Sequence, residues 1–197
     1  MNNRRVAILG HSNVPADYEH PTLETRVFRR GGAWIRDFDS YPIFREVFRW
    51  RHDLCLLFLG SNDIYAGCGT HRIATYIIQL ARRIEQQAGS TVLIVLIEPR
   101  NCPEDYQITT EEYSIIANSI NRQVRRARPG VRRNIDLWAQ VRPHLNHEGW
   151  HFTPAGIEII CRRFTEAINL FFGIEQDEGP IDPVPGVLGP AGNAEGE

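Results

Sequence analysis

Short, continuously apolar runs alternate along the chain with longer segments in which apolar residues recur every three or four positions. The runs at 6–9, 54–59 and 91–97 each end at a glycine or a polar residue, which is the pattern of strands buried on both faces. The run at 91–97 is rich in β-branched residues and predicts a strand most strongly. Weaker strand patterns lie at 24–28 and 134–137.

Amphipathic helical periods fill the intervals between these runs. One covers 73–88, with apolar residues along a single face, and Gly89 stands where a helix C-cap is expected. A second begins at a capping box formed by Thr109 and Glu112, and Pro129 prevents its continuation.

The last helix carries the clearest signals, because Thr153 is a favourable N-cap, Pro154 fits the first helical position, and an apolar stripe follows. A further short helix is predicted over 42–50. Strands that alternate with helices of this length predict right-handed βαβ units. We therefore expect an α/β fold, a three-layer α/β/α sandwich around a parallel sheet of about five strands.

The composition indicates one folded domain followed by a tail. With 42% hydrophobic residues, the chain can build one core over 1–172, and it contains no run of 18 apolar residues that would span a bilayer. Residues 173–197 contain six acidic and no basic residues and are rich in Gly and Pro, so we expect a disordered tail. The basic N-terminus lacks the apolar length of a secretory signal, which favours a cytoplasmic location.

The basic and sulfur-containing residues exclude several kinds of chemistry. All 22 basic residues are arginine, so no lysine is present to form a Schiff base. The four cysteines show no metal-ligand spacing. Cys55 and Cys161 lie in apolar runs typical of core thiols. The sequence does not decide whether Cys68 and Cys102 form a disulfide.

Three histidines near the C-terminus suggest a metal site by their spacing alone. His144, His147 and His151 are separated like successive helical turns, but Pro143 and Gly149 interrupt any helix there. We therefore predict neither a metal nor another cofactor, and no phosphate-binding loop or dinucleotide fingerprint occurs.

Polar residues suited to acyl transfer follow the predicted strands. Ser12 follows the first strand by three residues, Asn62 follows the third by three, and His151 precedes the last helix. In a doubly wound sheet of order 2-1-3-4-5 the first and third strands are neighbours, and ligands bind at the crevice between their carboxyl ends. For Ser12 alone a helix cap is the simpler interpretation, but three blocks at one edge favour a site. Asp63 is expected to brace the asparagine loop.

These blocks resemble those of the SGNH-type (GDSL-like) esterases, a family named after Ser, Gly, Asn and His residues carried in separate motifs. Ser12 in Gly-His-Ser, Gly32 in Gly-Gly-Ala, Asn62 in Gly-Ser-Asn-Asp and His151 in Gly-Trp-His-Phe-Thr-Pro match them in order. The resemblance covers residues 5–172 and implies a flavodoxin-like sandwich of strand order 2-1-3-4-5. The active site would lie at the strand ends.

The resemblance also implies a mechanism and a substrate class. Ser12 would attack a small acyl ester, His151 would take its proton, and Glu148 would hold the imidazole tautomer. The oxyanion hole would consist of the backbone N–H groups of Ser12 and Gly32 and the amide of Asn62. The implied activity is that of an esterase or deacetylase.

Two positions depart from the family pattern. The family usually has Asp where this chain has His11 and Asp where it has Glu148. Glutamate offers the same acceptor chemistry, whereas His11 is expected to displace Ser12 if the missing aspartate organises the turn. The alternative is therefore a binding domain of the same fold without hydrolytic activity, one setting for which is a protein encoded by a mobile element.

A basic segment near the end of the fourth helix raises the question of nucleic-acid binding. Its members are Arg122, Arg125, Arg126, Arg128, Arg132 and Arg133. No aromatic residues interleave with them to form a stacking platform, so a solvated helix face is the favoured interpretation and phosphate binding the alternative.

Overall fold

The sheet is parallel and has the expected order. The computed structural model describes residues 4–104, 107–129 and 134–175 of the 197-residue chain. Within that part, the strands are β1 (Arg5–Gly10), β2 (Glu24–Arg29), β3 (Leu54–Phe58), β4 (Thr91–Val95) and β5 (Asn134–Ile135). They pair in the order β2-β1-β3-β4-β5, all parallel. The predicted fold class is confirmed.

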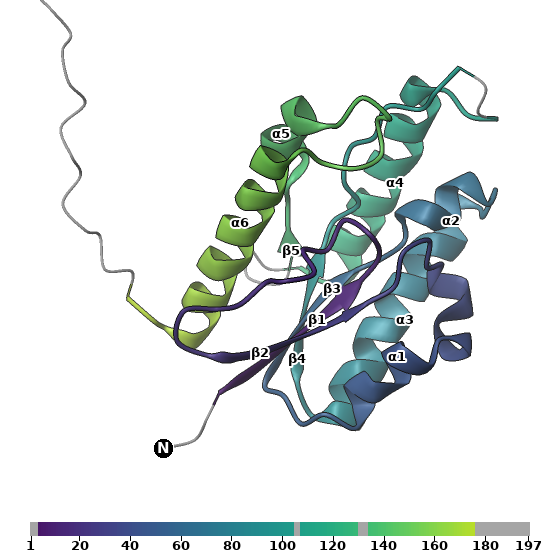
Figure 1. Ribbon diagram of the computed structural model, residues 1–197. Helices are drawn as coiled ribbons and strands as arrows, with labels where there is room; N and C mark the ends of the chain where they lie inside the picture. The colour runs from purple at the N-terminus through teal and green to yellow at the C-terminus, as the bar shows by residue number, and fades with distance from the viewer. Residues whose placement is uncertain (1–3, 105–106, 130–133, 176–197) are drawn as a thin grey trace, which may run out of the picture.

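Helices cover both faces of this sheet (Figure 1). One layer contains α1 (Pro42–Arg45), α3 (Thr70–Ala88) and α4 (Thr110–Ala127), with the short α2 (Ser61–Tyr65) beside them. The other contains α5 (Trp138–Val141) and α6 (Pro154–Phe172). Short 3₁₀ segments at Ile35–Ser40, Glu46–Phe48 and Arg142–His144 complete the connections, and the first of them is kinked at Asp37.

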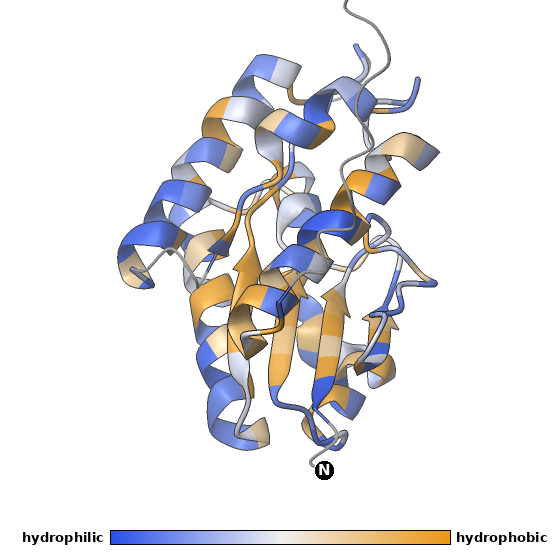
Figure 2. Ribbon diagram, turned by 90° about the vertical axis from the view of Figure 1, so that its left-hand side faces the viewer, coloured by the Kyte–Doolittle hydropathy of each residue, from blue (hydrophilic) through white to orange (hydrophobic). Residues whose placement is uncertain are grey.

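The alternation of side chains along the strands builds two cores. Ala7 and Leu57 point to the layer of α3 and α4, whereas Ile8 and Leu56 point to α6, where they meet Phe164. All five side chains are fully buried. Figure 2 shows the apolar strands enclosed between helices whose outer faces are polar. Because both faces are covered, the strands are continuously apolar.

The predicted helix ends are confirmed. Gly89 ends α3 in the left-handed conformation with φ +67°. The Thr109 hydroxyl accepts a hydrogen bond from the Glu112 N–H at 3.2 Å, and the Glu112 carboxylate accepts one from the Thr109 N–H at 2.9 Å. The Thr153 hydroxyl caps α6. The helix predicted over 42–50 is instead α1 followed by a 3₁₀ turn, because the Arg49 N–H bonds to the carbonyl three residues before it.

The remaining predictions concern the cysteines, a membrane span and the C-terminal tail. All four cysteines are free, with Cys55 buried in the core, so the structure contains no bridge between Cys68 and Cys102. None of the helices in the described ranges combines the length and apolar character of a bilayer span. The predicted tail lies outside the described residues from residue 176 onward.

Candidate active site

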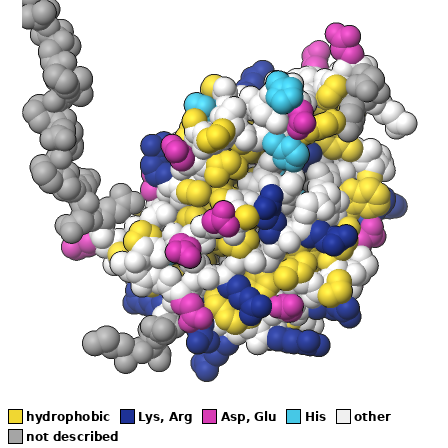
Figure 3. Space-filling view, in the orientation of Figure 1, with side chains coloured by type: hydrophobic (Ala, Val, Ile, Leu, Met, Phe, Trp, Pro, Cys, Tyr) yellow, Lys and Arg dark blue, Asp and Glu magenta, His cyan; other side chains and the backbone are white. Residues whose placement is uncertain are grey.

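The carboxyl ends of the strands bring the four sequence blocks together. Ser12 follows β1, Gly32 follows β2, Asn62 is the second residue of α2 after β3, and His151 lies just before α6. In Figure 3 histidine side chains gather, close to acidic ones, at the upper end of the molecule. Ser12, Gly32, Asn62 and His151 line one open pocket of about 440 Å³.

Ser12, His151 and Glu148 form a hydrogen-bonded chain. The Ser12 Oγ lies 3.1 Å from His151 Nε2, and His151 Nδ1 lies 3.4 Å from Glu148 Oε2. Asn146 and the Trp150 indole donate further hydrogen bonds to the same carboxylate oxygen at 3.3 and 3.1 Å. These donors, together with His151, lower the pKa of Glu148. The carboxylate is thus ionised and aligned with the imidazole, although both groups are about half exposed.

The loop that carries His151 is pinned against the chain after β4. Gly149 has φ +83°, and a Cβ at this position would lie 2.2 Å from the Asn101 carbonyl oxygen. This close approach lets the Asn101 N–H donate to the Gly149 carbonyl at 2.8 Å. The Asn146 N–H donates to the His151 carbonyl at 2.8 Å. Only glycine fits here without moving the loop away from the sheet.

Three N–H groups lie beside the serine as candidate oxyanion donors. Within the described residues, the backbone N–H groups of Ser12 and Gly32 donate to no protein acceptor. The Asn62 amide donates one hydrogen to the Ala33 carbonyl at 2.9 Å, which leaves its second hydrogen unused by that bond. Gly32 has φ +67° and open space around a built Cβ, so the position requires glycine for its backbone conformation.

Asp63 connects the asparagine and glycine blocks. Its buried carboxylate accepts hydrogen bonds from the backbone N–H groups of Ile35 and Arg36 at 2.8 and 3.3 Å. Burial raises the pKa of Asp63 despite these bonds. These hydrogen bonds hold the asparagine loop, which was expected to be braced by Asp63, against the segment after Gly32.

His11 does not displace Ser12. The His11 ring is fully buried, packs against Phe58, and accepts a hydrogen bond at Nδ1 from the Asn13 N–H at 3.2 Å. Its Nε2 lies 3.1 Å from the Ser61 Oγ. The turn is thus held by the imidazole, and the Ser12 hydroxyl still reaches His151, which corrects our expectation.

Two residues missed by the sequence analysis belong to this site: Arg100 lines the pocket, and Glu98 forms an ion pair with it. Both follow β4 and are buried, and Arg100 donates to the Asn62 Oδ1 at 3.1 Å. The signal that could have found them is their position after the run at 91–97, because residues after neighbouring parallel strands share one edge of the sheet.

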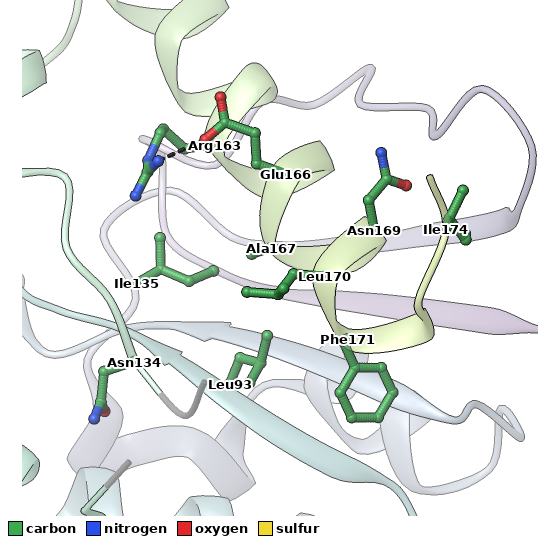
Figure 4. A pocket seen from close by; sticks show the side chains of 10 residues that line it. All are labelled: Leu93, Asn134, Ile135, Arg163, Glu166, Ala167, Asn169, Leu170, Phe171 and Ile174. Carbon is green, nitrogen blue, oxygen red and sulfur yellow. Dashed lines mark hydrogen bonds and ion pairs between the residues drawn. The ribbon is translucent and has the colours of Figure 1, made fainter. Parts of the chain in front are cut away.

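Another hollow, of about 440 Å³, lies between β4, β5 and the C-terminal half of α6 (Figure 4). Apolar side chains such as Leu93, Ile135 and Leu170 line much of it, and Arg163 pairs with Glu166 at its rim. It shares no lining residue with the pocket at Ser12. Across the described ranges, no group of three or more His, Cys, Asp or Glu side chains is placed to hold a metal ion.

Part of the basic segment binds its own chain. Arg125 pairs with Asp136, and the buried Arg128 pairs with Glu85. Arg132 and Arg133 fall outside the described residues. Two of the six arginines of the segment are therefore paired within the chain.

Comparison with known proteins places the fold. No protein-family model and no curated protein sequence matches the chain. A GDSL-like lipase from Bacteroides thetaiotaomicron is similar with a TM-score of 0.65 and 15% identity, over 86% of this chain and 89% of the lipase.

Two further solved structures have the same architecture. A member of the lipolytic G-D-S-L family from Veillonella parvula has a TM-score of 0.66 at 12% identity, over 83% of this chain and 97% of its own. A carbohydrate esterase family 3 protein from Talaromyces cellulolyticus has a TM-score of 0.64 at 13% identity, over 88% of this chain and 100% of the esterase. The chain therefore has the fold of the SGNH (GDSL-like) hydrolases.

Proposed function

We propose that the protein is a serine ester hydrolase that uses Ser12 as nucleophile, His151 as general base and Glu148 as the group that orients the imidazole. The observation that carries this proposal is the hydrogen-bonded chain from the Ser12 hydroxyl through His151 to Glu148, which opens on a pocket. A nucleophile within reach of a base, itself oriented by a third group, is the arrangement that acyl transfer requires.

The reaction follows from this arrangement. His151 Nε2 takes the proton of the Ser12 hydroxyl as Oγ attacks the carbonyl carbon of the ester, and the C=O electrons move to the carbonyl oxygen. Collapse of the tetrahedral intermediate expels the alcohol, which receives the proton from His151. Water, deprotonated by the same imidazole, then attacks the acyl carbon; the bond to Ser12 Oγ breaks, the acid leaves, and Oγ takes the proton back from His151.

The negative charge on the tetrahedral oxygen would be met by the N–H groups of Ser12 and Gly32 and by the Asn62 amide. Such donors act in the transition state, where charge develops, and removal of one costs about 2.7–4 kcal/mol in a well-studied protease. Their convergence beside Ser12 supports hydrolysis of a carbonyl ester rather than simple ligand binding.

The proposed substrate is a small acyl ester. The pocket is open and is lined by Trp34, Tyr65 and Trp150 beside the catalytic groups, so an alcohol or sugar moiety can extend out of it. One protein of similar fold is a carbohydrate esterase, which is in line with a short acyl group on a larger alcohol.

Hydrolysis of p-nitrophenyl esters from acetyl to decanoyl tests this proposal. Ser12→Ala should abolish hydrolysis and keep the fold, whereas Ser114→Ala, which removes a hydroxyl from the side of α4, should leave it unchanged. Equal rates for Ser12→Ala and the unaltered protein would remove Ser12 from the mechanism.

A second candidate is a binding domain of the same fold. The exposure of Glu148 and its 3.4 Å distance from His151 favour it, because a weakly held imidazole is a weaker base. A folded protein that hydrolyses none of these esters and does not react with a fluorophosphonate would have this function.

A further inference from the structure

A cluster of buried polar side chains adjoins the pocket, which one of its members, Arg100, lines. Its centre is the ion pair of Glu98 and Arg100, whose side chains are 0% and 5% exposed and whose closest atoms are 2.9 Å apart. Both residues come from the chain that follows β4. A charge pair at this depth needs donors and acceptors around it, and the site loops supply them.

One oxygen of Glu98 is the centre of this cluster. Oε1 accepts hydrogen bonds from Arg100 Nε at 3.1 Å and from Asn13 Nδ2 at 3.1 Å, and His11 Nε2 lies 3.5 Å away. Burial alone would raise the pKa of Glu98, but the His11 ring and the Arg100 guanidinium outweigh it and hold that pKa well below the usual range. The carboxylate is therefore an anion that fixes the direction of the guanidinium.

The same cluster connects the loops that carry the candidate catalytic groups. Asn13, next to the nucleophile, donates both to Glu98 and to the Trp150 carbonyl at 3.0 Å, next to His151. Arg100 donates through one NH₂ group to the Ser61 hydroxyl at 2.8 Å and through the other to Asn62. A shift of the ion pair would therefore move side chains in three loops.

Arg100 and the Ala33 carbonyl together fix which way the Asn62 amide faces. A guanidinium only donates, so the atom that it contacts at 3.1 Å must be the amide oxygen. The amide nitrogen then faces the other way, where the Ala33 carbonyl accepts one of its hydrogens. The second hydrogen remains for an oxyanion in the pocket, which Arg100 and Asn62 both line.

The pair is not explained by stability alone. Within the described residues, the other oxygen of Glu98 is buried and has no hydrogen-bond partner. Apolar side chains of similar volume often replace a buried ion pair without loss of stability, so its presence is weak evidence for a stabilising role. The contacts of the ion pair with the site loops indicate a role in positioning those loops instead.

We propose that Arg100, held by Glu98, is a positioning residue that orients the Asn62 amide toward the oxyanion of the transition state. This inference rests on the proposed esterase function and adds to it the source of the orientation of one oxyanion donor.

A double-mutant cycle tests whether Arg100 acts through Asn62. Asn62→Ala is expected to lower kcat on the order of 10²–10³-fold, the usual loss for one oxyanion donor. Arg100→Met should lower kcat at least about tenfold with little change in KM, because the orientation matters only when charge develops. The double variant should be no slower than Asn62→Ala, within about threefold; a loss equal to the product of the two single losses would overturn the proposal.

Two further variants separate positioning from folding. Glu98→Met combined with Arg100→Met replaces the pair by apolar side chains and strands no charge, so it should fold and still lower kcat. Arg128→Met removes another buried, paired arginine away from the pocket and should lower stability while kcat stays unchanged. Full kcat in the folded Met/Met protein would refute the positioning role.

An NMR measurement tests the orientation without catalysis. The side-chain amide signals of Asn62 should shift or broaden in Arg100→Met, whereas those of Asn118, on the outer part of α4, should not. Unchanged Asn62 signals in the folded variant would overturn the proposal. If the unaltered protein hydrolyses no ester but these signals respond as expected, the esterase function fails and the orientation by Arg100 stands.

Discussion

The buried ion pair under the site gives a sharp prediction about stability. Replacing Glu98 by Gln keeps the shape of the side chain but removes the charge that compensates Arg100. The guanidinium, 5% exposed, would remain charged in the interior without an anionic partner. Breaking one side of such a pair is costly because the surviving charge keeps its desolvation penalty.

The geometry sets the size of the effect. At the 2.9 Å separation of Arg100 NH2 and Glu98 Oε1, Coulomb's law with an effective dielectric constant of about 20 gives roughly 6 kcal/mol of attraction. Measured losses for broken buried pairs are about 3–5 kcal/mol. We expect about 3 kcal/mol for Glu98→Gln, the lower end of that range, since the Gln carbonyl can still accept hydrogen bonds.

A matched surface pair provides the control. Arg26 and Glu46 approach to 2.8 Å, nearly the same distance, but both are more than 40% exposed. Exposed pairs contribute about 0.2–1 kcal/mol, so Glu46→Gln should change the free energy of unfolding by less than about 1 kcal/mol. Urea denaturation of the three proteins at pH 7 measures the contrast.

The pH dependence gives an independent check. The pKa of Glu98 is lowered in the folded protein from its ordinary value of 4.5, so its stabilising contribution is complete above that value and is lost as the pH falls below it. The unaltered protein should therefore lose more stability between pH 6 and pH 3 than Glu98→Gln. Equal stability of Glu98→Gln and the unaltered protein at pH 7, with parallel slopes in acid, would refute the reasoning.

Four other substitutions have defined outcomes. Glu148→Gln should lower kcat by much less than the roughly 10⁴-fold loss known for a buried triad carboxylate, because this exposed side chain can turn its oxygen toward His151; a 10⁴-fold loss would contradict this. Gly32→Ala and Gly89→Ala share φ +67° and open surroundings, so both should lose about 1–2 kcal/mol of stability in urea, but only Gly32→Ala should lose ester hydrolysis. Asp63 accepts one hydrogen bond on each carboxylate oxygen, from the N–H groups of Ile35 and Arg36, and Asp63→Asn keeps only one of these acceptors. The free energy of unfolding should fall by about 1–3 kcal/mol in urea. An unchanged urea midpoint would show that Asp63 does not brace this segment.

The sequence predicts the sheet and the long helices because hydrophobic period and caps are local signals. The runs at 6–9, 54–59 and 91–97 became central strands, and Thr109 and Thr153 begin helices as expected. The short helical elements outside 42–50, such as Ser61–Tyr65 and Trp138–Val141, were not predicted, because so few residues do not show a helical period. The parallel pairing follows from the helices that connect the strands, whereas the strand order β2-β1-β3-β4-β5 was expected only from the resemblance to the SGNH-type esterases.

The candidate site is predicted only in part, because its parts depend on different kinds of signal. Ser12, Asn62 and His151 lie at fixed offsets from strands and helices, and the structure brings them to one pocket. Glu98 and Arg100 carry no motif; their roles depend on contacts 38 and 85 residues away, with Asn62 and Asn13. Such contacts appear only when the strands are in place.

Reaction with a fluorophosphonate, followed by mass spectrometry of the modified peptide, tests the central claim most directly. A serine activated by an adjacent imidazole displaces fluoride and keeps the phosphonyl group, and activation of Ser12 by His151 at 3.1 Å is what the proposed mechanism requires. The account predicts one adduct, on Ser12, that is absent from Ser12→Ala and forms far more slowly in His151→Ala. A folded protein that gains no adduct, or gains it elsewhere at the same rate in Ser12→Ala, would contradict it.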